Sequence, residues 1–287
     1  MKNHNFIINN LSADVNNKLK NEVLFILSSY IIGIIYIKYN HRGDFYMIYE
    51  EYVKASLEDY GRNGRLEERA ILRVLEDISC YHSDSIGYGA RNIQDRKLAW
   101  LLLEWRVKIH NPMRYGESYR VTTWSRGVCS PCTTLRDFEI FDEEGNLCVS
   151  ASSKWTPVNA IDKKLIRVTD ELLALYGTEE KSAFSEGDLT RLREPKEYSY
   201  EMPYRVYRKE IDLNGHLHNL CYLDIALETL PEEVYEERDF TEIRITYRKE
   251  VRADERDITC KYREDNGVHT VGVYGPDGKL RAIVALS

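Results

Sequence analysis

The chain has 287 residues, of which 43% are hydrophobic and 30% are charged. This length and composition predict a globular protein of two medium-sized domains. The formal net charge of −7 argues against a nucleic-acid-binding protein, because neutralising phosphates needs a concentrated basic surface. The 21 tyrosines favour β structure, since aromatic rings pack well on pleated sheets.

The first 46 residues differ from the rest of the chain. A polar, Asn-rich stretch over 1–20 precedes the apolar run 23–37 (VLFILSSYIIGIIYI). The run is shorter than the ~20 residues of a membrane-spanning helix, and no small-residue cleavage site follows it. Three interpretations stay open: a weak apolar anchor, a buried helix, or a natural start at Met47. In each case we treat 1–46 as an N-terminal extension without stable membrane insertion.

From Met47 onward, one pattern occurs twice, and such internal similarity indicates a repeated structural unit. Each copy has an Asn-Gly turn followed by a basic or imidazole side chain and a leucine, at 63–66 (NGRL) and 214–217 (NGHL). A run with apolar residues three and four positions apart follows each turn. This spacing predicts one helix within 60–79 and a second within 204–230.

Four strand-like segments follow each predicted helix, separated by turn signals such as those at 144–146 and 276–278. One helix followed by an antiparallel sheet, repeated, predicts an α+β protein with a tandem (double) hotdog fold, in which each sheet wraps a helix. We expect an N-terminal hotdog domain over 47–180, a polar linker over 181–200 and a C-terminal hotdog domain over 201–287. The predicted strands are 103–110, 118–124, 134–141 and 147–155, then 240–251, 256–263, 267–274 and 280–286.

The two copies differ at the turn. The first copy has Arg65, whereas the second has Asp212, Asn214 and His216 close together in the sequence. The structural interpretation is that these residues form the turn and cap the next helix. The functional interpretation is a carboxylate or imidazole that activates water beside helix N–H donors, which stabilise an oxyanion. The residues alone leave both interpretations open.

A resemblance to a known family is carried by two segments, 212–231 (DLNGHLHNLCYLDIALETLP) and 245–251 (ITYRKEV). They closely resemble the acyl-acyl-carrier-protein thioesterases of plant plastids and bacteria. That family has the signature D-x-N-x-H-x-N-N-x-x-Y, then a helix ending in Leu-Glu and a strand with Tyr-Arg-Arg-Glu-Cys. The likeness includes 98–127 and 151–155 and covers about 47–287. The matched positions are Asp212, Asn214, His216, Asn219, Tyr222, Glu228, Tyr247, Arg248 and Glu250.

The resemblance implies hydrolysis of a fatty acyl thioester on acyl carrier protein, which releases a free fatty acid and ends chain elongation. It implies Asp212 as the nucleophile or as the residue that activates one, with Asn214 and His216 orienting it and stabilising charge. Glu250 would be the water-activating base. No cofactor or metal is implied. The second half would be catalytic, and the first half would form the acyl-chain tunnel.

The sequence departs from the family signature at two positions. His218 replaces the first asparagine of the Asn-Asn pair, and Val251 replaces the cysteine, which removes a cysteine mechanism at that position. We interpret the nearby Cys221 as a small packed residue rather than as a nucleophile. The six scattered cysteines are typical of reduced thiols in a cytoplasmic protein. The single C-x-x-C pair, Cys129 and Cys132, lacks the partners of a zinc site.

Three alternative functions are an acyl-CoA thioesterase, a hydroxyacyl dehydratase and a non-catalytic acyl-binding hotdog module. The His-Phe-Pro-like run of the dehydratases is absent. A non-catalytic module would be expected to lose the second cluster, but it is the first copy that lacks it.

Because this chain has a net charge of −7, binding an acidic acyl carrier protein would require a local rim of basic residues on its surface. A double hotdog already contains the pairing of two single hotdogs, and it can pair again into a homodimer. The candidate rim residues are Lys163, Lys164, Arg167, Arg191, Arg193, Arg205, Arg208 and Lys209.

Overall fold

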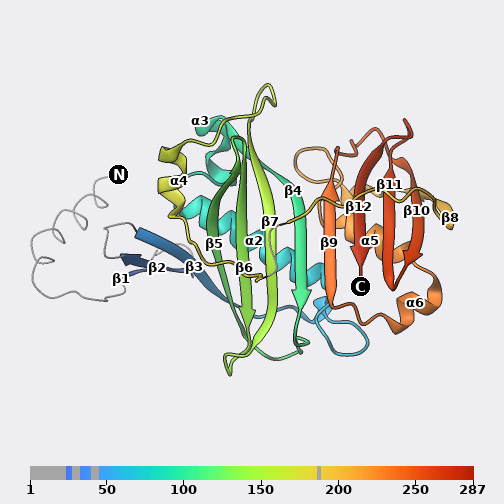
Figure 1. Cartoon of the computed structure of the whole chain (residues 1–287), viewed down its shortest axis with the longest axis horizontal. Helices are drawn as coiled ribbons and strands as arrows, with labels where there is room; N and C mark the ends of the chain where they lie inside the picture. Colours follow the sequence, from blue (N-terminus) through green and yellow to red (C-terminus); the bar gives the residue numbers. More distant parts are fainter. Residues whose placement is uncertain (1–23, 28–32, 40–44, 186–188) are drawn as a thin grey trace, which may run out of the picture.

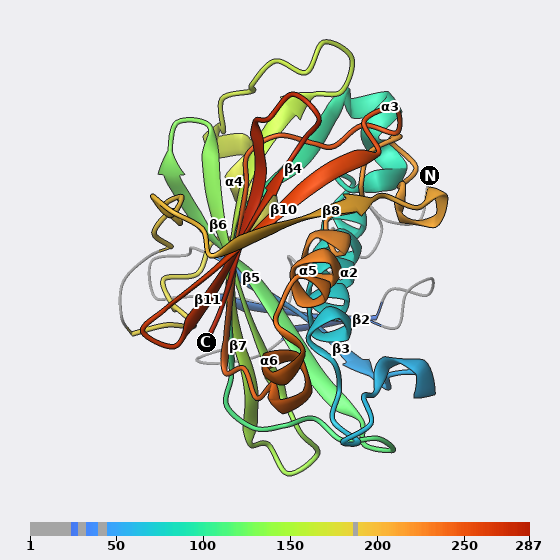
Figure 2. The same ribbon diagram turned by 90° about the vertical axis from the view of Figure 1, so that its right-hand side faces the viewer.

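The computed structural model describes residues 24–27, 33–39, 45–185 and 189–287. Within these residues, twelve strands form one sheet, and the two main helices, α2 and α5, cover the same face of it (Figures 1 and 2). The strands are β1 (Leu24–Leu27), β2 (Gly33–Tyr39), β3 (Phe45–Val53), β4 (Leu98–Ile109), β5 (Tyr119–Ser130), β6 (Thr133–Phe141), β7 (Leu147–Asn159), β8 (Tyr200–Arg205), β9 (Glu242–Tyr247), β10 (Asp257–Asp265), β11 (Val268–Tyr274) and β12 (Leu280–Leu286). The helices are α2 (Glu68–Ser85), α3 (Ile93–Arg96), α4 (Asp170–Tyr176), α5 (Cys221–Glu228) and α6 (Glu232–Glu237), with 3-10 turns η2 (Leu57–Asp59), η3 (Ala90–Asn92) and η4 (Arg208–Glu210).

The two halves of the sheet repeat each other in mirrored order. The first half runs β3-β5-β6-β7-β4, and the second runs β9-β12-β11-β10-β8. Strands β4 and β9 pair antiparallel at the junction, with Trp105 opposite Ile245. One hydrophobic core therefore extends through both halves, from Leu75 of α2 and Phe138 of β6 to Leu223 of α5. The halves share a core because their sheets are continuous.

The predicted elements agree with this architecture in kind, and their bounds differ by several residues. Both predicted helices are present, and all eight predicted strands exist. Strand β4 begins earlier than expected, at Leu98, and contains a register shift between Leu102 and Glu104. Helix α4 lies before the expected linker and is not among the elements predicted from the sequence. Thr169 caps this helix by accepting the N–H of Leu172 at 3.3 Å.

The N-terminal extension pairs with the sheet where the structure describes it. Strand β2 lies antiparallel between β1 and β3, so the buried-helix interpretation is wrong for 24–27 and 33–39. The remaining residues of the extension, at 1–23, 28–32 and 40–44, lie outside the described residues. In the described part of the chain, no helix is both long and apolar enough to cross a membrane.

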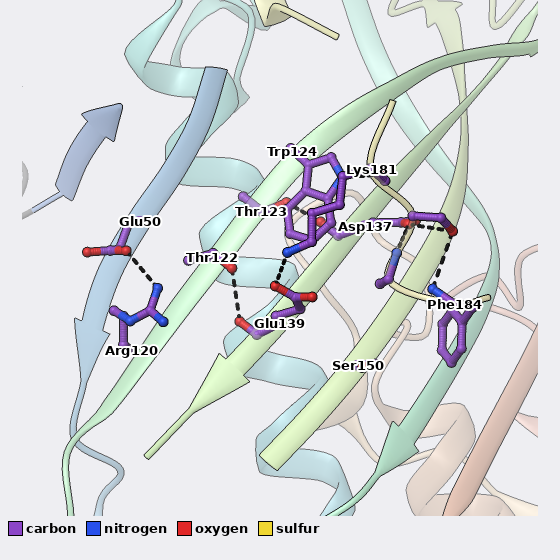
Figure 3. Close-up of polar contacts among 12 residues, drawn as sticks. Glu50, Arg120, Thr122, Thr123, Trp124, Asp137, Glu139, Ser150, Lys181 and Phe184 are labelled. Carbon is purple, nitrogen blue, oxygen red and sulfur yellow. Dashed lines mark hydrogen bonds and ion pairs between the residues drawn. The ribbon is translucent and has the colours of Figure 1, made fainter. Parts of the chain in front are cut away.

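The segment that joins the halves crosses the face of the sheet that is turned away from α2 and α5 (Figure 1). Its contacts begin in the first half, where Trp124 Nε1 donates to the Lys181 carbonyl at 2.8 Å. The fully buried Asp137 accepts the Ala183 N–H at 2.7 Å, and Lys181 pairs with Glu139 (Figure 3). This segment is therefore fastened to the sheet rather than free of it.

Candidate active site

The loop that precedes α5 is held together by the carboxylate of Asp212. Its Oδ1 accepts the N–H groups of Asn214 and His216 at 2.8 and 3.0 Å, and its Oδ2 accepts the Asn214 side-chain amide at 3.2 Å. Gly215 sits in the turn at φ +79°, a conformation that favours glycine. Asp212 thus has the turn-forming role of the structural interpretation, and its three contacts orient Asn214 and His216.

The imidazole of His216 meets Glu250, which follows strand β9. His216 Nε2 lies 3.7 Å from Glu250 Oε1, and both side chains are partly exposed. The backbone brings them together, because the N–H of Leu217 donates to the Val251 carbonyl at 2.8 Å, and His216 and Arg252 form an isolated antiparallel β-bridge. The two segments of the sequence motif therefore form one site in the folded chain.

A cavity of about 580 Å³ begins at this loop and extends into the first half. Asp212 and Asn214 line it, whereas His216 and Glu250 are not among the described residues that do so. One wall is α2 from Arg69 to Ser83, which corresponds to about 20 Å of helix at its usual rise. The predicted site residues therefore form two groups, one at the cavity and one beside it. Apolar lining residues include Leu98, Trp100, Leu135, Trp155, Leu172 and Tyr176.

The expected oxyanion donors at the start of α5 are not free. The N–H groups of Cys221, Tyr222 and Leu223 donate to the carbonyls of 218–220 at 2.9 to 3.3 Å. Each of these hydrogen bonds joins an N–H to the carbonyl three residues earlier, as in a 3-10 helix. They tighten the first turn and occupy N–H groups that a helix start usually leaves unpaired. The prediction that this helix start offers free N–H groups to an oxyanion is therefore wrong, and the donors must come from elsewhere.

Two tyrosines of the motif, Tyr222 and Tyr247, hydrogen-bond to the backbone on either side of the site. The Val251 N–H donates to the Tyr222 hydroxyl at 3.1 Å, and the Tyr247 hydroxyl donates to the Asn219 carbonyl at 3.1 Å. Their rings meet edge to face at 5.5 Å between centroids. Burial raises the pKa of both hydroxyls, so they remain neutral hydrogen-bonding groups. These motif positions hold the loop against the segment of Glu250.

The equivalent loop of the first half has the same backbone but different side chains. Gly61 donates its N–H to the Arg65 carbonyl at 3.0 Å, as Asp212 does to the His216 carbonyl at 2.7 Å. The N–H of Leu66 donates to the Met113 carbonyl, as that of Leu217 does to Val251, which makes Pro112 the counterpart of Glu250. Of the four predicted site residues, only the asparagine has an identical counterpart. The residue pairs are Gly61 with Asp212, Asn63 with Asn214, Arg65 with His216 and Pro112 with Glu250.

The structure adds Glu76 of α2, which sequence analysis missed. Its Oε1 accepts the Asn219 side-chain amide at 3.3 Å, and the residue lines the cavity together with Asp212. Glu76 stands among the charged residues of an amphipathic helix, so its sequence pattern is that of a solvated face. The only available signal was Asn219, a motif residue to which no role had been given.

The two cysteines nearest to the site are protonated thiols. Cys221 is buried on α5, and burial raises the pKa of its thiol to about 11. Burial likewise raises the pKa of Cys80, which lines the cavity, to about 12. Thiols with such pKa values are protonated near pH 7 and are poor nucleophiles. No group of three or more His, Cys, Asp or Glu residues in the described part could hold a metal ion.

The chain is a tandem hotdog protein, and the loop of its second half places an imidazole beside a carboxylate, which the equivalent loop of the first half does not. Two family models match the chain: the acyl-ACP thioesterase N-terminal domain over 47–176 and the C-terminal domain over 193–272. The chain belongs to the acyl-ACP thioesterase family. The family and the fold predicted from the sequence are therefore confirmed.

Among sequence relatives, the chain is 26% identical over 248 residues to oleoyl-acyl carrier protein thioesterase 1 of Arabidopsis thaliana, covering 79% of this chain and 68% of that protein. Thioesterase 2 of the same plant is 26% identical over 223 residues, with coverage of 72% and 60%. The chain thus spans about two thirds of the length of these relatives.

Among solved structures, the 12:0-ACP thioesterase from Umbellularia californica matches with a TM-score of 0.74 at 17% identity, over 84% of this chain and 96% of that one. An acyl-ACP thioesterase from Bacteroides thetaiotaomicron matches with a TM-score of 0.71 at 18% identity, over 83% and 96%. At these identities the likeness shows the shared fold.

Proposed function

We propose that this chain hydrolyses the thioester of a fatty acyl-acyl carrier protein and releases the free fatty acid. The observation that carries the proposal is the position of Asp212 and Asn214 at a long cavity, next to the paired side chains of His216 and Glu250. The names of the sequence relatives, which are oleoyl-acyl carrier protein thioesterases, support the same substrate class.

In the proposed reaction, water attacks the thioester carbonyl while Glu250, beside His216, accepts the proton of the water. The side-chain amide of Asn214 stabilises the oxyanion, and the thiolate of the carrier leaves when the intermediate collapses. The contacts of Asp212 favour an orienting role over nucleophilic attack, because its Oδ1 already accepts two backbone N–H groups. No step requires a metal or another cofactor.

The proposal is tested by measuring the release of free thiol from an acyl carrier thioester. We expect wild-type protein to hydrolyse it and both Asp212→Ala and His216→Ala to lose about 10²-fold or more of kcat. Arg65→Ala removes the counterpart of His216 in the first half and should keep full activity. Normal rates in both second-half variants would refute the site, and a non-catalytic acyl-binding module would release no thiol at all.

We also propose a division of labour between the halves. The N-terminal hotdog over 47–180 supplies the wall of the acyl tunnel, the linker over 181–200 joins the halves, and the hotdog over 201–287 carries the chemistry. The cavity supports this division, because its lining residues lie largely on α2, β4, β5, β6 and α4 of the first half. A cytoplasmic location is part of the proposal, because six scattered cysteines in a chain of this length are typical of reduced thiols.

The carrier protein is proposed to dock on Arg208 and Lys209 of η4, next to the cavity mouth. Both side chains are exposed, neither has an ion pair within the described residues, and Lys209 lines the cavity. Their first-half counterparts on η2 are Leu57 and Glu58, which carry no positive charge. Two free cations beside the one complete site suit an acidic partner.

This docking surface is tested with the double variant Arg208→Glu, Lys209→Glu. We expect its KM for acyl carrier protein to rise about tenfold or more, with no change for acyl-pantetheine, which lacks the protein and its charge. Lys54→Glu, an exposed lysine just after β3 that is neither a rim candidate nor a cavity-lining residue, is the matched control. An equal loss on acyl-CoA would indicate recognition of the phosphate instead, and would contradict docking of the carrier protein.

A further inference from the structure

The carboxyl group of Glu76 reaches the site of the second half from α2 of the first half. Its Oε1 is held by the side chain of Asn219, while its Oε2 is buried without a hydrogen-bond partner among the described residues. Asn219 also accepts the Tyr247 hydroxyl at its carbonyl, so it links α2 to β9. Glu76 is thus fixed at one oxygen, and a buried oxygen without a partner is costly if it carries a charge.

The charged and titratable groups around Glu76 come from three elements. Asp77 and Cys80 lie on its own helix, Asp212 and His218 lie on the loop before α5, and Tyr247 lies on β9. Burial raises the pKa of Glu76, and the negative charges of Asp77 and Asp212 raise it further. His218 and the hydrogen bond from Asn219 act in the opposite direction. These surroundings favour the acid form of Glu76.

We propose that Glu76 is a positioning residue of the active site that works in its protonated form, with its charge tuned by His218 from the opposite half. In this form it holds Asn219, and through it the start of α5, without placing a second negative charge beside Asp212. His218 stands where the family signature has asparagine, and both His218 and Glu76 line the cavity, so this chain places an imidazole close enough to influence the carboxyl group of Glu76. The inference rests on the proposed thioester hydrolysis and deepens it.

The acid form makes a prediction about the dependence of kcat/KM on pH. Because activity requires the protonated carboxyl, kcat/KM should fall as the pH rises through the pKa of Glu76. Glu76→Gln keeps a neutral amide of the same shape, so it should keep near-normal activity and lose this decline. Glu76→Ala removes the anchor of Asn219 and should lose about tenfold to a hundredfold of kcat, because a displaced site is a poor catalyst.

Substitution of two neighbours of Glu76 should shift the pH at which kcat/KM declines, in opposite directions. His218→Asn removes a group that lowers the pKa of Glu76, so the decline should shift to higher pH. Asp77→Asn removes a group that raises this pKa, so the decline should shift to lower pH. These opposite signs separate an effect on Glu76 from a general disturbance of the loop, which would move both variants alike.

The experiment records kcat/KM against pH for wild type and the four variants, together with a carboxyl carbon-13 NMR titration of wild type and Glu76→Gln. A decline that persists in Glu76→Gln would overturn the proposal, as would shifts of the same sign in His218→Asn and Asp77→Asn. If wild type hydrolyses no acyl thioester, the proposed function fails. The NMR titration then still tests Glu76, because a carboxyl that titrates at its ordinary pKa contradicts the acid form.

Discussion

His216 Nε2 and Glu250 Oε1 lie 3.7 Å apart, although the two residues belong to separate segments of the motif. Strand β9 and the loop before α5 bring them together through the contact of Leu217 with Val251. The pair stands beside the cavity rather than in its lining. In the proposed reaction, Glu250 therefore takes the proton from a water molecule that lies outside the acyl-chain cavity.

We predict that Glu250→Gln lowers kcat by about 10² to 10⁴, because the amide cannot accept the proton of water. Stability should change by less than about 1 kcal/mol, since an exposed pair contributes little. Steady-state thiol release measures kcat, and urea unfolding measures the stability. Glu236→Gln, on exposed α6, removes a carboxylate away from the site and should behave as wild type. A normal kcat in Glu250→Gln would remove Glu250 from the mechanism.

A second prediction concerns Cys221, the cysteine nearest to the site in sequence. Because burial raises the pKa of its thiol to about 11, the thiolate is scarce at pH 7. Cys221→Ala should therefore keep the wild-type kcat, apart from a small loss of stability. Iodoacetamide should label the exposed Cys129 first and leave activity intact. Loss of kcat in a folded Cys221→Ala variant would reopen a cysteine mechanism.

A third prediction concerns Cys80, which lines the cavity and can be replaced by a larger side chain that fills part of it. Cys80→Phe should reduce kcat/KM for long acyl chains by about 10-fold or more and spare short ones, because the ring occupies space along α2. The measurement is hydrolysis across a series of acyl lengths. Cys129→Phe adds the same bulk on the β5–β6 hairpin, outside the cavity lining, and should leave the length profile unchanged. A uniform loss at all lengths would argue against an acyl tunnel along α2.

The fourth prediction concerns Asp137, which fastens the linker to the sheet. Asp137→Ala leaves the Ala183 N–H and the Ser152 hydroxyl without their acceptor, at a cost of about 1 to 3 kcal/mol of unfolding free energy. Asp137→Asn should cost less, because it keeps an acceptor oxygen. Urea unfolding measures both, and the exposed Asp239→Ala serves as the control.

The buried carboxyl of Asp137 should also make the free energy of unfolding depend on pH. Burial raises the pKa of this carboxyl above that in the unfolded chain. The folded state therefore binds the proton more tightly, and this contribution to stability is lost as the pH rises through the raised pKa. The stability of wild type relative to Asp137→Asn should fall with rising pH across that range. An opposite trend would show that the hydrogen bonds to the carboxylate outweigh its burial.

Much of the fold could be predicted because its signals are local. The apolar stripe of Ile71, Val74, Leu75 and Ile78 indicates α2, and these side chains are buried against the sheet. Turn residues such as Gly145 and Gly278, both with positive φ, mark the hairpins between strands. Of the three interpretations of the apolar run at 23–37, the buried helix is wrong for the described parts, which are strands, because short apolar runs suit helix and strand alike.

The sequence by itself indicated the repeat and the turn of Asp212, Asn214 and His216, because a turn bonds to its own neighbours in the chain, and the motif around this turn indicated the family. Only the tertiary structure decided how the halves cooperate. Pairing of β4 with β9 places α2 beside the second loop, so the first half supplies the cavity wall and Glu76. The tertiary structure also shows that the N–H groups of Cys221, Tyr222 and Leu223 at the start of α5 are already hydrogen-bonded. Such contacts depend on packing between distant segments, and no local pattern records which polar side chain of α2 meets the site.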